Sequence, residues 1–445
     1  MTQIDWIGSG GTFNGNFTDT VHWAGGNVPD SSGEVARFQN GGPTAYTVNV
    51  TTAITPQSIL LENAACTLDE TSGGSITANS LHVDQGIAIL NAANAIARVF
   101  LSAGGTIEFS NNRAMGVHDV NLDEGGTLIA TASMTLHNQI ELGGQGATVA
   151  AATGDTLRLG GPLFVGDTIG VHFGKASATG TVVLVSDALV SDPNNVHVDI
   201  DGGRMASVVG ESGAMEQLLN DAVGISVASG ATLDLGNLST TMDLHMLIGA
   251  GTLRDIADGP LVQVANANFA GKLLGVASIE ADGSNTFSGK LNGVAFTAGA
   301  GSSTLNLANA TGGFTLTAPT GSHATVVIDK TAGTYENFQD GNLTIQTGYS
   351  FAADTVTFEA GPGTSLIADI HHGSTIVHQL VFEGITSSDG ITVSNHAHNI
   401  EFTWTGAAET APHAIHEAFA HDAWTHHGIG TQPVVHDPWA AHDFI

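Results

Sequence analysis

The sequence predicts an all-β fold, a right-handed parallel β-helix in which short strands stack rung upon rung. A small-small-Thr-aliphatic pattern recurs at 104–107, 125–128 and 146–149, so its threonines lie 21 residues apart. Between these four-residue repeats, the segments 117–122 and 136–142 alternate apolar and polar residues, which is typical of strands with one buried face. A fixed period of this length indicates a repeat architecture, and about 21 residues can hold three short strands and three turns.

The composition agrees with a solenoid, which grows in length without splitting into domains. The chain has 445 residues, of which 58 are glycine and 42% are hydrophobic, so neither collagen nor a disordered chain fits. A chain of β-sandwich domains is the alternative fold, but it would repeat about every 90 residues. No apolar run approaches the ~20 residues of a membrane helix, and we expect no membrane insertion.

The charge balance constrains the partners. The 42 acidic and 10 basic residues give a formal net charge of −32, and the basic residues are scattered singly. Such a surface repels nucleic acid and attracts divalent cations, so no nucleic-acid partner is expected. Calcium is the one candidate cofactor that this excess of carboxylates favours, although no sequence motif requires it.

Residues 1–45 are expected to form an N-terminal cap, because bulky aromatic side chains can close the open end of a solenoid. The first rungs are then expected to begin with strands at 46–50 and 58–62. The aromatic residues of this cap are Trp6, Phe13, Phe17, Trp23 and Phe38.

Two sets of residues resemble known proteins. Trp6 followed by 23–30 and 45–50 resembles the opening of many bacterial surface and secreted β-helix proteins. The segments 265–273 and 283–291 resemble the Asn-aromatic-small-Gly cell of autotransporter-type passenger repeats. The resemblance implies a β-helix outside the cell, and it implies almost nothing about activity.

The β-helix itself is expected to occupy 46–395, with an irregular insertion near 186–224 that breaks the repeat. Within the insertion, residues 212–222 predict a short helix with Ser212 as its N-cap. The repeat resumes at 231–235. The single cysteine, Cys66, allows no intrachain disulfide and is expected to be buried.

Residues 396–445 form a distinct His-rich C-terminal tail. It holds nine of the 20 histidines, and no Lys or Arg follows Lys330. An end of this kind is similar to the uncleaved C-terminal signal of type I secretion substrates, and the first residues lack the features of a cleaved signal peptide. We therefore expect a secreted protein that is extracellular or attached to the cell surface.

The tail also contains candidate metal ligands, His413, His416, Glu417 and His421. On a helix, residues three or four apart are neighbours, and such a set suits zinc or another transition ion. The order of His and Glu does not match the zincin motif. The favoured interpretation is a tail whose histidines are solvated.

A second candidate cation site lies at Asp199 and Asp201, which alternate with His197 and should share one strand face. On β-helices, clustered carboxylates bind calcium or act as acid and base on polysaccharides. Enzymes of that kind usually add basic and aromatic side chains, but Arg204 is the only basic residue nearby. No catalytic residues are therefore predicted. A solvated outer face is favoured, and cation binding is the second interpretation.

The sequence thus favours a non-enzymatic extracellular structural protein that self-associates into a surface layer, filament or biofilm matrix. Parallel rungs can extend by the hydrogen bonds that build them, so a homo-oligomer or polymer is the expected partner state. One alternative is an adhesin that binds surface glycans or cells. Another is a polysaccharide-active β-helix enzyme.

Overall fold

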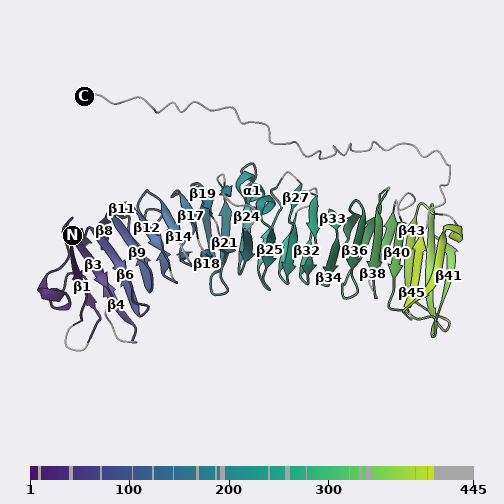
Figure 1. Ribbon diagram of the computed structural model, residues 1–445, viewed down its shortest axis with the longest axis horizontal. Helices are drawn as coiled ribbons and strands as arrows, with labels where there is room; N and C mark the ends of the chain where they lie inside the picture. The colour runs from purple at the N-terminus through teal and green to yellow at the C-terminus, as the bar shows by residue number, and fades with distance from the viewer. Residues whose placement is uncertain are drawn as a thin grey trace, which may run out of the picture. The chain divides into compact units, whose positions relative to one another are not determined.

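The computed structural model describes residues 1–404 except for short segments at 9–11, 40–43, 71–72, 103, 123–124, 144, 167–169, 186–187, 191–195, 239–240, 256–260, 277, 320, 330–332, 337–341, 386 and 398. Strands make up 56% of the protein and helices 5%, and stacked parallel strands form a β-solenoid of about 13 turns (Figure 1). The predicted parallel β-helix is confirmed. The strands lie on three faces, and the second face has a described strand in only some of the rungs.

The first face is a continuous parallel stack that runs through the solenoid, and each strand pairs with the equivalent strand of the next rung. Strand β18 is long enough to turn the corner, so it contributes to both the first and the second face. The strands of the first face are β2 (Gly15–Asn16), β4 (Tyr46–Asn49), β7 (Cys66–Asp69), β10 (Ile87–Leu90), β13 (Thr106–Phe109), β15 (Thr127–Ala130), β18 (Gln145–Leu159), β20 (Gly170–Phe173), β23 (His197–Ile200), β25 (Gly224–Val227), β28 (Met246–Gly249), β31 (Asn268–Phe269), β34 (Ser284–Phe287), β36 (Ser302–Asn306), β38 (His323–Val327) and β40 (Asn342–Gln346).

The second face consists of shorter strands in two parallel groups. The first group is β5 (Ala53–Ile54), β8 (Ser75–Ala78) and β11 (Ala95–Ile96). The second group begins on the C-terminal part of β18 and contains β16 (Met134–Leu136), β21 (Thr179–Leu184), β24 (Arg204–Ser207), β26 (Thr232–Asp234), β29 (Thr252–Arg254) and β32 (Lys272–Leu274).

The third face is divided into two sheets. The N-terminal sheet contains β1 (Thr2–Asp5), β3 (Glu34–Phe38), β6 (Ser58–Leu61), β9 (Ser80–Val83), β12 (Val99–Leu101), β14 (Val120–Leu122), β17 (Ile140–Leu142), β19 (Leu163–Val165) and β22 (Ala188–Val190). The parallel part of the C-terminal sheet contains β27 (Met242–Asp243), β30 (Val262–Ala265), β33 (Ser278–Asp282), β35 (Val294–Ala298), β37 (Phe314–Thr317) and β39 (Gly333–Glu336).

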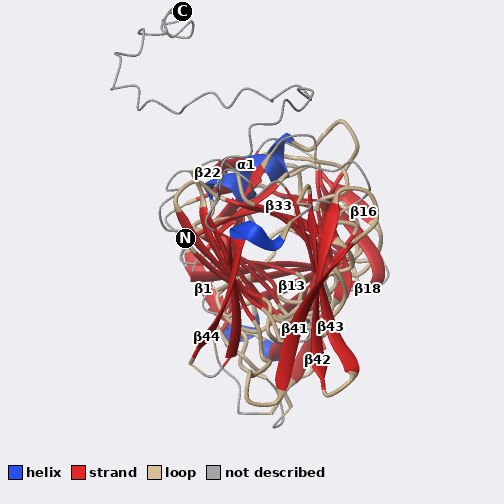
Figure 2. Ribbon diagram, turned by 90° about the vertical axis from the view of Figure 1, so that its right-hand side faces the viewer, coloured by secondary structure: helices blue, strands red, loops and turns tan. Residues whose placement is uncertain are grey.

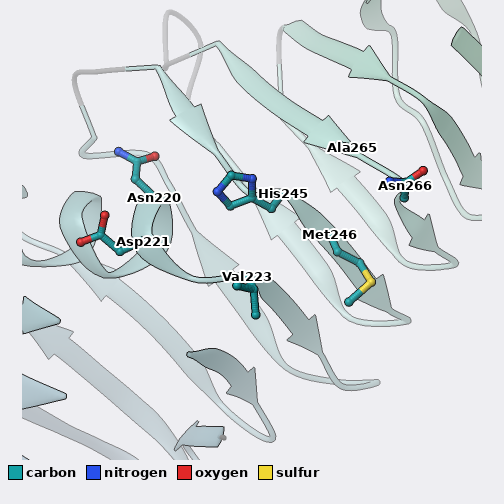
Figure 3. Close-up of a pocket in the computed structure, with 7 residues that line it drawn as sticks. All are labelled: Asn220, Asp221, Val223, His245, Met246, Ala265 and Asn266. Atoms are coloured by element: carbon teal, nitrogen blue, oxygen red, sulfur yellow. The ribbon is translucent and has the colours of Figure 1, made fainter. Parts of the chain in front are cut away.

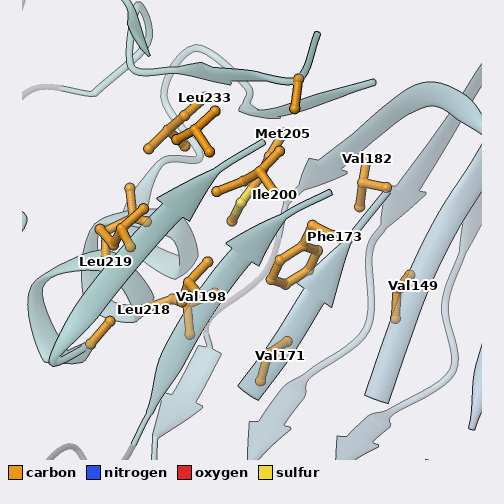
Figure 4. Packing of buried hydrophobic residues seen from close by; sticks show 14 of the residues in the cluster. Val149, Val171, Phe173, Val182, Val198, Ile200, Met205, Leu218, Leu219 and Leu233 are labelled. Carbon is orange, nitrogen blue, oxygen red and sulfur yellow. The ribbon is translucent and has the colours of Figure 1, made fainter. Parts of the chain in front are cut away.

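Helix α1 (Gly213–Asp221) lies where the third face is divided, and it packs against both β22 and β27. The helix therefore takes the place of a strand in that rung. The apolar face of α1 is buried, and Leu218 and Leu219 lie beside Val198 of β23 (Figure 4). The helix predicted at 212–222 is confirmed, although the Ser212 side chain makes no capping hydrogen bond.

The 21-residue pattern corresponds to the pairing register. Thr106 lies opposite Thr127 on the neighbouring strand, and Thr127 lies opposite Thr148. The aliphatic residue after each threonine is buried in the core. The constant step therefore reports one complete turn of the chain around the solenoid.

The two small residues before each threonine have separate roles. Gly104, Gly125 and Gly146 have φ angles of +90°, +92° and +81°, the left-handed region that glycine adopts without steric cost. Gly105 instead packs against the preceding rung, where an added Cβ would lie 1.8 Å from the carbonyl oxygen of Val83. The corner at 104–105 thus requires one glycine for its backbone angle and another for its lack of a side chain, whereas the corner at 146–147 accommodates the methyl group of Ala147 at the second position.

Aromatic side chains fill the N-terminal end, as expected. Trp6, Phe17, Trp23 and Phe38 are at most 1% exposed, and the Trp6 and Trp23 rings meet edge to face with centroids 5.0 Å apart. Short 3₁₀ turns at Thr20–His22 and Ala24–Gly26 carry the chain across this end. The segment is not separate from the helix, because β1, β2 and β3 already pair within the stacked faces.

The C-terminal end differs from the sequence expectation, in which the parallel β-helix reached residue 395. The added strands β41 (Asp354–Ala360), β42 (Ser365–His372), β43 (Thr375–Glu383), β44 (Ile391–His396) and β45 (Asn399–Trp404) form antiparallel pairs, with a 3₁₀ turn at Ser388–Gly390 (Figure 2). They cover the last rungs with buried apolar residues, namely Leu366, Ala368, Ile370, Leu380, Phe382, Ile400 and Phe402. Hairpins allow the chain to close its own core without a further rung.

The single cysteine is buried, as expected. Burial raises the pKa of the Cys66 thiol to about 12. Because the thiolate is the reactive form, Cys66 is a packing residue at neutral pH.

Candidate functional site

The carboxylates singled out in the sequence lie on the outer surface of the first face. Asp199 belongs to β23, and Asp201 directly follows that strand. On the preceding rung, His172 of β20 is paired with Asp199. The imidazole Nδ1 of His172 lies 2.7 Å from Oδ2 of Asp201 and 3.8 Å from Oδ2 of Asp199. His172 is thus a member of the cluster that sequence reasoning missed.

Glycines keep the surroundings of this cluster open. A Cβ added at Gly170 would lie 3.4 Å from the Asp199 carboxylate and 3.5 Å from Nε2 of His172. Another glycine, Gly224, pairs with His197 on the following strand, where an added Cβ would lie 2.9 Å from the imidazole Nδ1. The side chains of His172 and Asp199 therefore lie against glycine positions and stay 28% and 27% exposed.

The electrostatics of the cluster centre on Asp199. Burial raises the pKa of the Asp199 carboxyl, and the nearby charge of Asp201 raises it further, whereas His172 and His197 lower it. The neighbouring carboxylates of Asp199 and Asp201 could attract a cation.

Of the two metal sites predicted from the sequence, one lies within the described residues and the other lies outside them. In residues 1–404, outside the gaps given above, no group of three or more His, Cys, Asp or Glu side chains is arranged to hold a metal ion. Cation binding at Asp199 and Asp201 stays a prediction. The tail residues His413, His416, Glu417 and His421 lie outside the described residues.

A pocket of about 460 Å³ lies beside the end of α1 (Figure 3). Its walls come from the helix end, from the segment that leads to β25, and from two successive corners between the third and first faces. The lining residues are Asn220, Asp221, Val223, His245, Met246, Ala265 and Asn266. Nothing in the sequence alone marks this site, because it depends on where the helix interrupts the third face.

Both corners of the pocket have unusual backbone angles. His245 has a φ of 42° and Asn266 a φ of 59°, in the left-handed region that few non-glycine residues adopt. The first corner is fixed by polar contacts. The N–H of Asp243 donates to Oδ1 of Asn220 at 2.8 Å, and the N–H of His245 donates to Oδ1 of Asp243 at 2.9 Å. The bond to Asn220 holds the end of the helix against the corner, and the bond to Asp243 lies within the corner itself.

A second cavity, also of about 460 Å³, lies on the second face beside β8 and β11. Its most buried polar residue, Asn94, accepts the N–H of Ile76 at 2.7 Å and donates to the carbonyl of Ala114 at 2.8 Å. Because these bonds join neighbouring rungs, Asn94 has a structural role. This cavity is therefore a weaker candidate for ligand binding.

The geometry defines the class of protein as a β-solenoid. No protein-family model matches the chain, and no curated protein or solved structure shows significant similarity to it. Among the described helices, none has the length and apolar character needed to cross a membrane.

Proposed function

We propose that this protein is a non-enzymatic structural protein whose copies associate head to tail through the terminal strands of the solenoid. Such an assembly would form a filament, layer or matrix outside the cell. The observation that carries the proposal is the direction of the strands at the two ends of the stacked faces.

On the third face, β1 is the first strand and β41 the last. Strand β43 pairs parallel with β39, and the next two pairings, β43 with β42 and β42 with β41, are antiparallel. Two reversals restore the original direction. Strand β41 therefore runs in the same direction as the parallel strands of its face.

The first face ends in the same way. Strand β45 pairs antiparallel with β40, and β44 pairs antiparallel with β45. Two reversals again leave β44, the last strand, running in the direction of β40. At the opposite end of this face lies β2.

Both faces thus end on strands that could receive the start of another copy in the pairing mode of the solenoid. The β1 strand of one copy would pair parallel with β41 of the next, while β2 would pair with β44. A single reversal on either face would have prevented this match. Strands at a sheet edge carry unpaired N–H and C=O groups that readily accept another strand.

The edge of β1 can be assigned residue by residue. The N–H groups of Thr2 and Trp6 donate to carbonyls on the β3 side at 2.9 Å. Because N–H groups alternate in direction along a strand, those of Gln3 and Asp5 face away from β3. Gln3 also has an exposed side chain, so it can be changed without disturbing the core.

This assignment provides a test with a matched control. Proline at position 3 removes an outward N–H group and keeps the β1–β3 hydrogen bonds, whereas alanine removes the same side chain and keeps the N–H. The full-length wild type, Gln3→Pro and Gln3→Ala would be compared by sedimentation velocity over a concentration series. Negative-stain electron microscopy would be run in parallel, with calcium and with chelator.

We expect wild type and Gln3→Ala to polymerise alike, and Gln3→Pro to require about tenfold more protein or to remain monomeric. Polymers of equal length in all three proteins would show that association does not use this edge. Isolated monomers of the wild type at every concentration, with and without calcium, would overturn the proposed function. An adhesin that acts as a monomer would then be the better proposal.

A further inference from the structure

We propose that the pocket beside α1 binds a saccharide unit that is either neutral or carries an amino group. This site is independent of the strand edges that the proposed self-association uses. The proposal is supported by the position of the pocket, the chemistry of its walls, its charge and its backbone geometry.

The pocket exists because a helix replaces a strand. Where α1 takes the place of a strand in the third face, the surface of that face is no longer a regular ladder. The end of the helix, the corner that contains His245 and the next corner line an open pocket of about 460 Å³. Small-molecule sites commonly have volumes of a few hundred Å³, and this one is large enough for a sugar ring.

The walls combine hydrogen-bonding groups with an apolar surface. Figure 3 shows the imidazole of His245 between the helix end, with Asn220 and Asp221, and Asn266 on the next corner. Val223, Met246 and Ala265 contribute apolar atoms. Amide, carboxylate and imidazole groups can bind hydroxyl groups, while apolar side chains can pack against the C–H groups of a sugar ring.

The charge of the pocket selects among saccharides. No Lys or Arg is among its lining residues, and one acidic residue, Asp221, is. The C-terminal end of α1 adds the partial negative charge of its carbonyl groups, and no basic residue occupies the last turn of the helix. An acidic sugar would be repelled, whereas a neutral sugar would be accepted and an ammonium group attracted.

The left-handed residues support a binding role. Backbone conformations of this kind are costly and occur often at ligand sites, where the surrounding structure holds them in place. Of the four non-glycine residues with positive φ in the described residues, two line this pocket, His245 and Asn266. Asn292 has a similar φ of 54° and does not line the pocket.

The strained corner makes a clean test possible. Glycine adopts these φ angles without strain, so His245→Gly removes the imidazole and relieves backbone strain at the same position. Asn292→Gly is the matched control, since it makes the same kind of change at a corner outside the pocket. Asp221→Asn keeps the shape of the helix end and removes one negative charge.

The probes are methyl glucoside, glucosamine and glucuronate, measured on the full-length protein by saturation-transfer NMR and isothermal titration calorimetry. We expect glucosamine to bind most tightly, methyl glucoside more weakly and glucuronate not at all. His245→Gly should weaken glucosamine and methyl glucoside about tenfold, and Asn292→Gly should leave both unchanged. Asp221→Asn should reduce the preference for glucosamine over methyl glucoside.

Three results would overturn the proposal. The first is that none of the probes binds at millimolar concentration. The second is that glucuronate binds as well as glucosamine. The third is that His245→Gly, shown to be folded by its circular dichroism and thermal melt, binds the sugars as well as Asn292→Gly does.

Discussion

His172 lies on one rung, and Asp201 directly follows the strand of the next rung. Nδ1 of His172 lies 2.7 Å from Oδ2 of Asp201. Because His172 also lowers the pKa of Asp199, the two rungs share one electrostatic cluster. We predict that His172→Ala raises the pKa of Asp199 further, since burial and the charge of Asp201 remain while the opposing imidazole is lost. A carbon-13 NMR titration of the carboxyl groups would measure it, and an unchanged or lower pKa would contradict it.

A buried carboxyl in the N-terminal rungs leads to a prediction about pH. Glu70 is fully buried and accepts N–H groups of Asn91 at 2.7 Å and Ala92 at 2.6 Å. Burial, the largest influence, raises the pKa of Glu70 above its ordinary value of 4.5. The Glu70 carboxyl therefore binds its proton more tightly in the native state than in the unfolded state. The stability that this protonation contributes is present at low pH and is lost as pH rises through the folded-state pKa of Glu70.

Glu70→Gln keeps an acceptor oxygen and removes the charge. We expect this variant to be at least as stable as the wild type at pH 7, and to lose the part of the wild-type pH dependence that lies above pH 4.5. Urea unfolding from pH 4 to pH 8 would measure this. Glu383→Gln, at an exposed position, is the control and should behave as the wild type. A marked loss of stability at pH 7 in Glu70→Gln would contradict the prediction.

The close contact between rungs leads to a prediction about Gly105. An alanine Cβ there would lie 1.8 Å from a backbone oxygen, so neighbouring rungs would have to separate. We expect Gly105→Ala to lower the free energy of unfolding by about 3 kcal/mol, the upper range for overpacking. At Gly33 no heavy atom lies within 4 Å of an added Cβ, and Gly33→Ala should change stability by less than about 1 kcal/mol. Equal effects in the two variants, measured by chemical denaturation, would contradict this explanation.

Much of the fold could be predicted because the repeat is a physical measure of one turn. Threonines 21 residues apart pair directly, and the residues that alternate with polar positions are buried. The short helix was also predictable, since residues 212–222 lack the period-two alternation of a strand. The repeat and the helix depend on the local sequence, so a local pattern is enough to predict them.

The rest depends on relationships that a local pattern does not contain. Alternation of period two is the same for parallel and antiparallel strands, so it did not reveal the reversals at β41 to β45. His172 was missed because it lies 29 residues before Asp201, farther apart than one 21-residue step. The pocket could not be predicted because it requires knowing which strand α1 replaces.

The substitution of a strand by α1 also has a mechanical consequence. In the rungs directly next to the helix, a force that separates the rungs must break hydrogen bonds between strands on all three faces. Across the helix, the described strands of only two faces are paired, β23 with β25 and β24 with β26. Under tension along the stack, this level would part before the rungs directly next to it, and each half would keep the closed end that it already has.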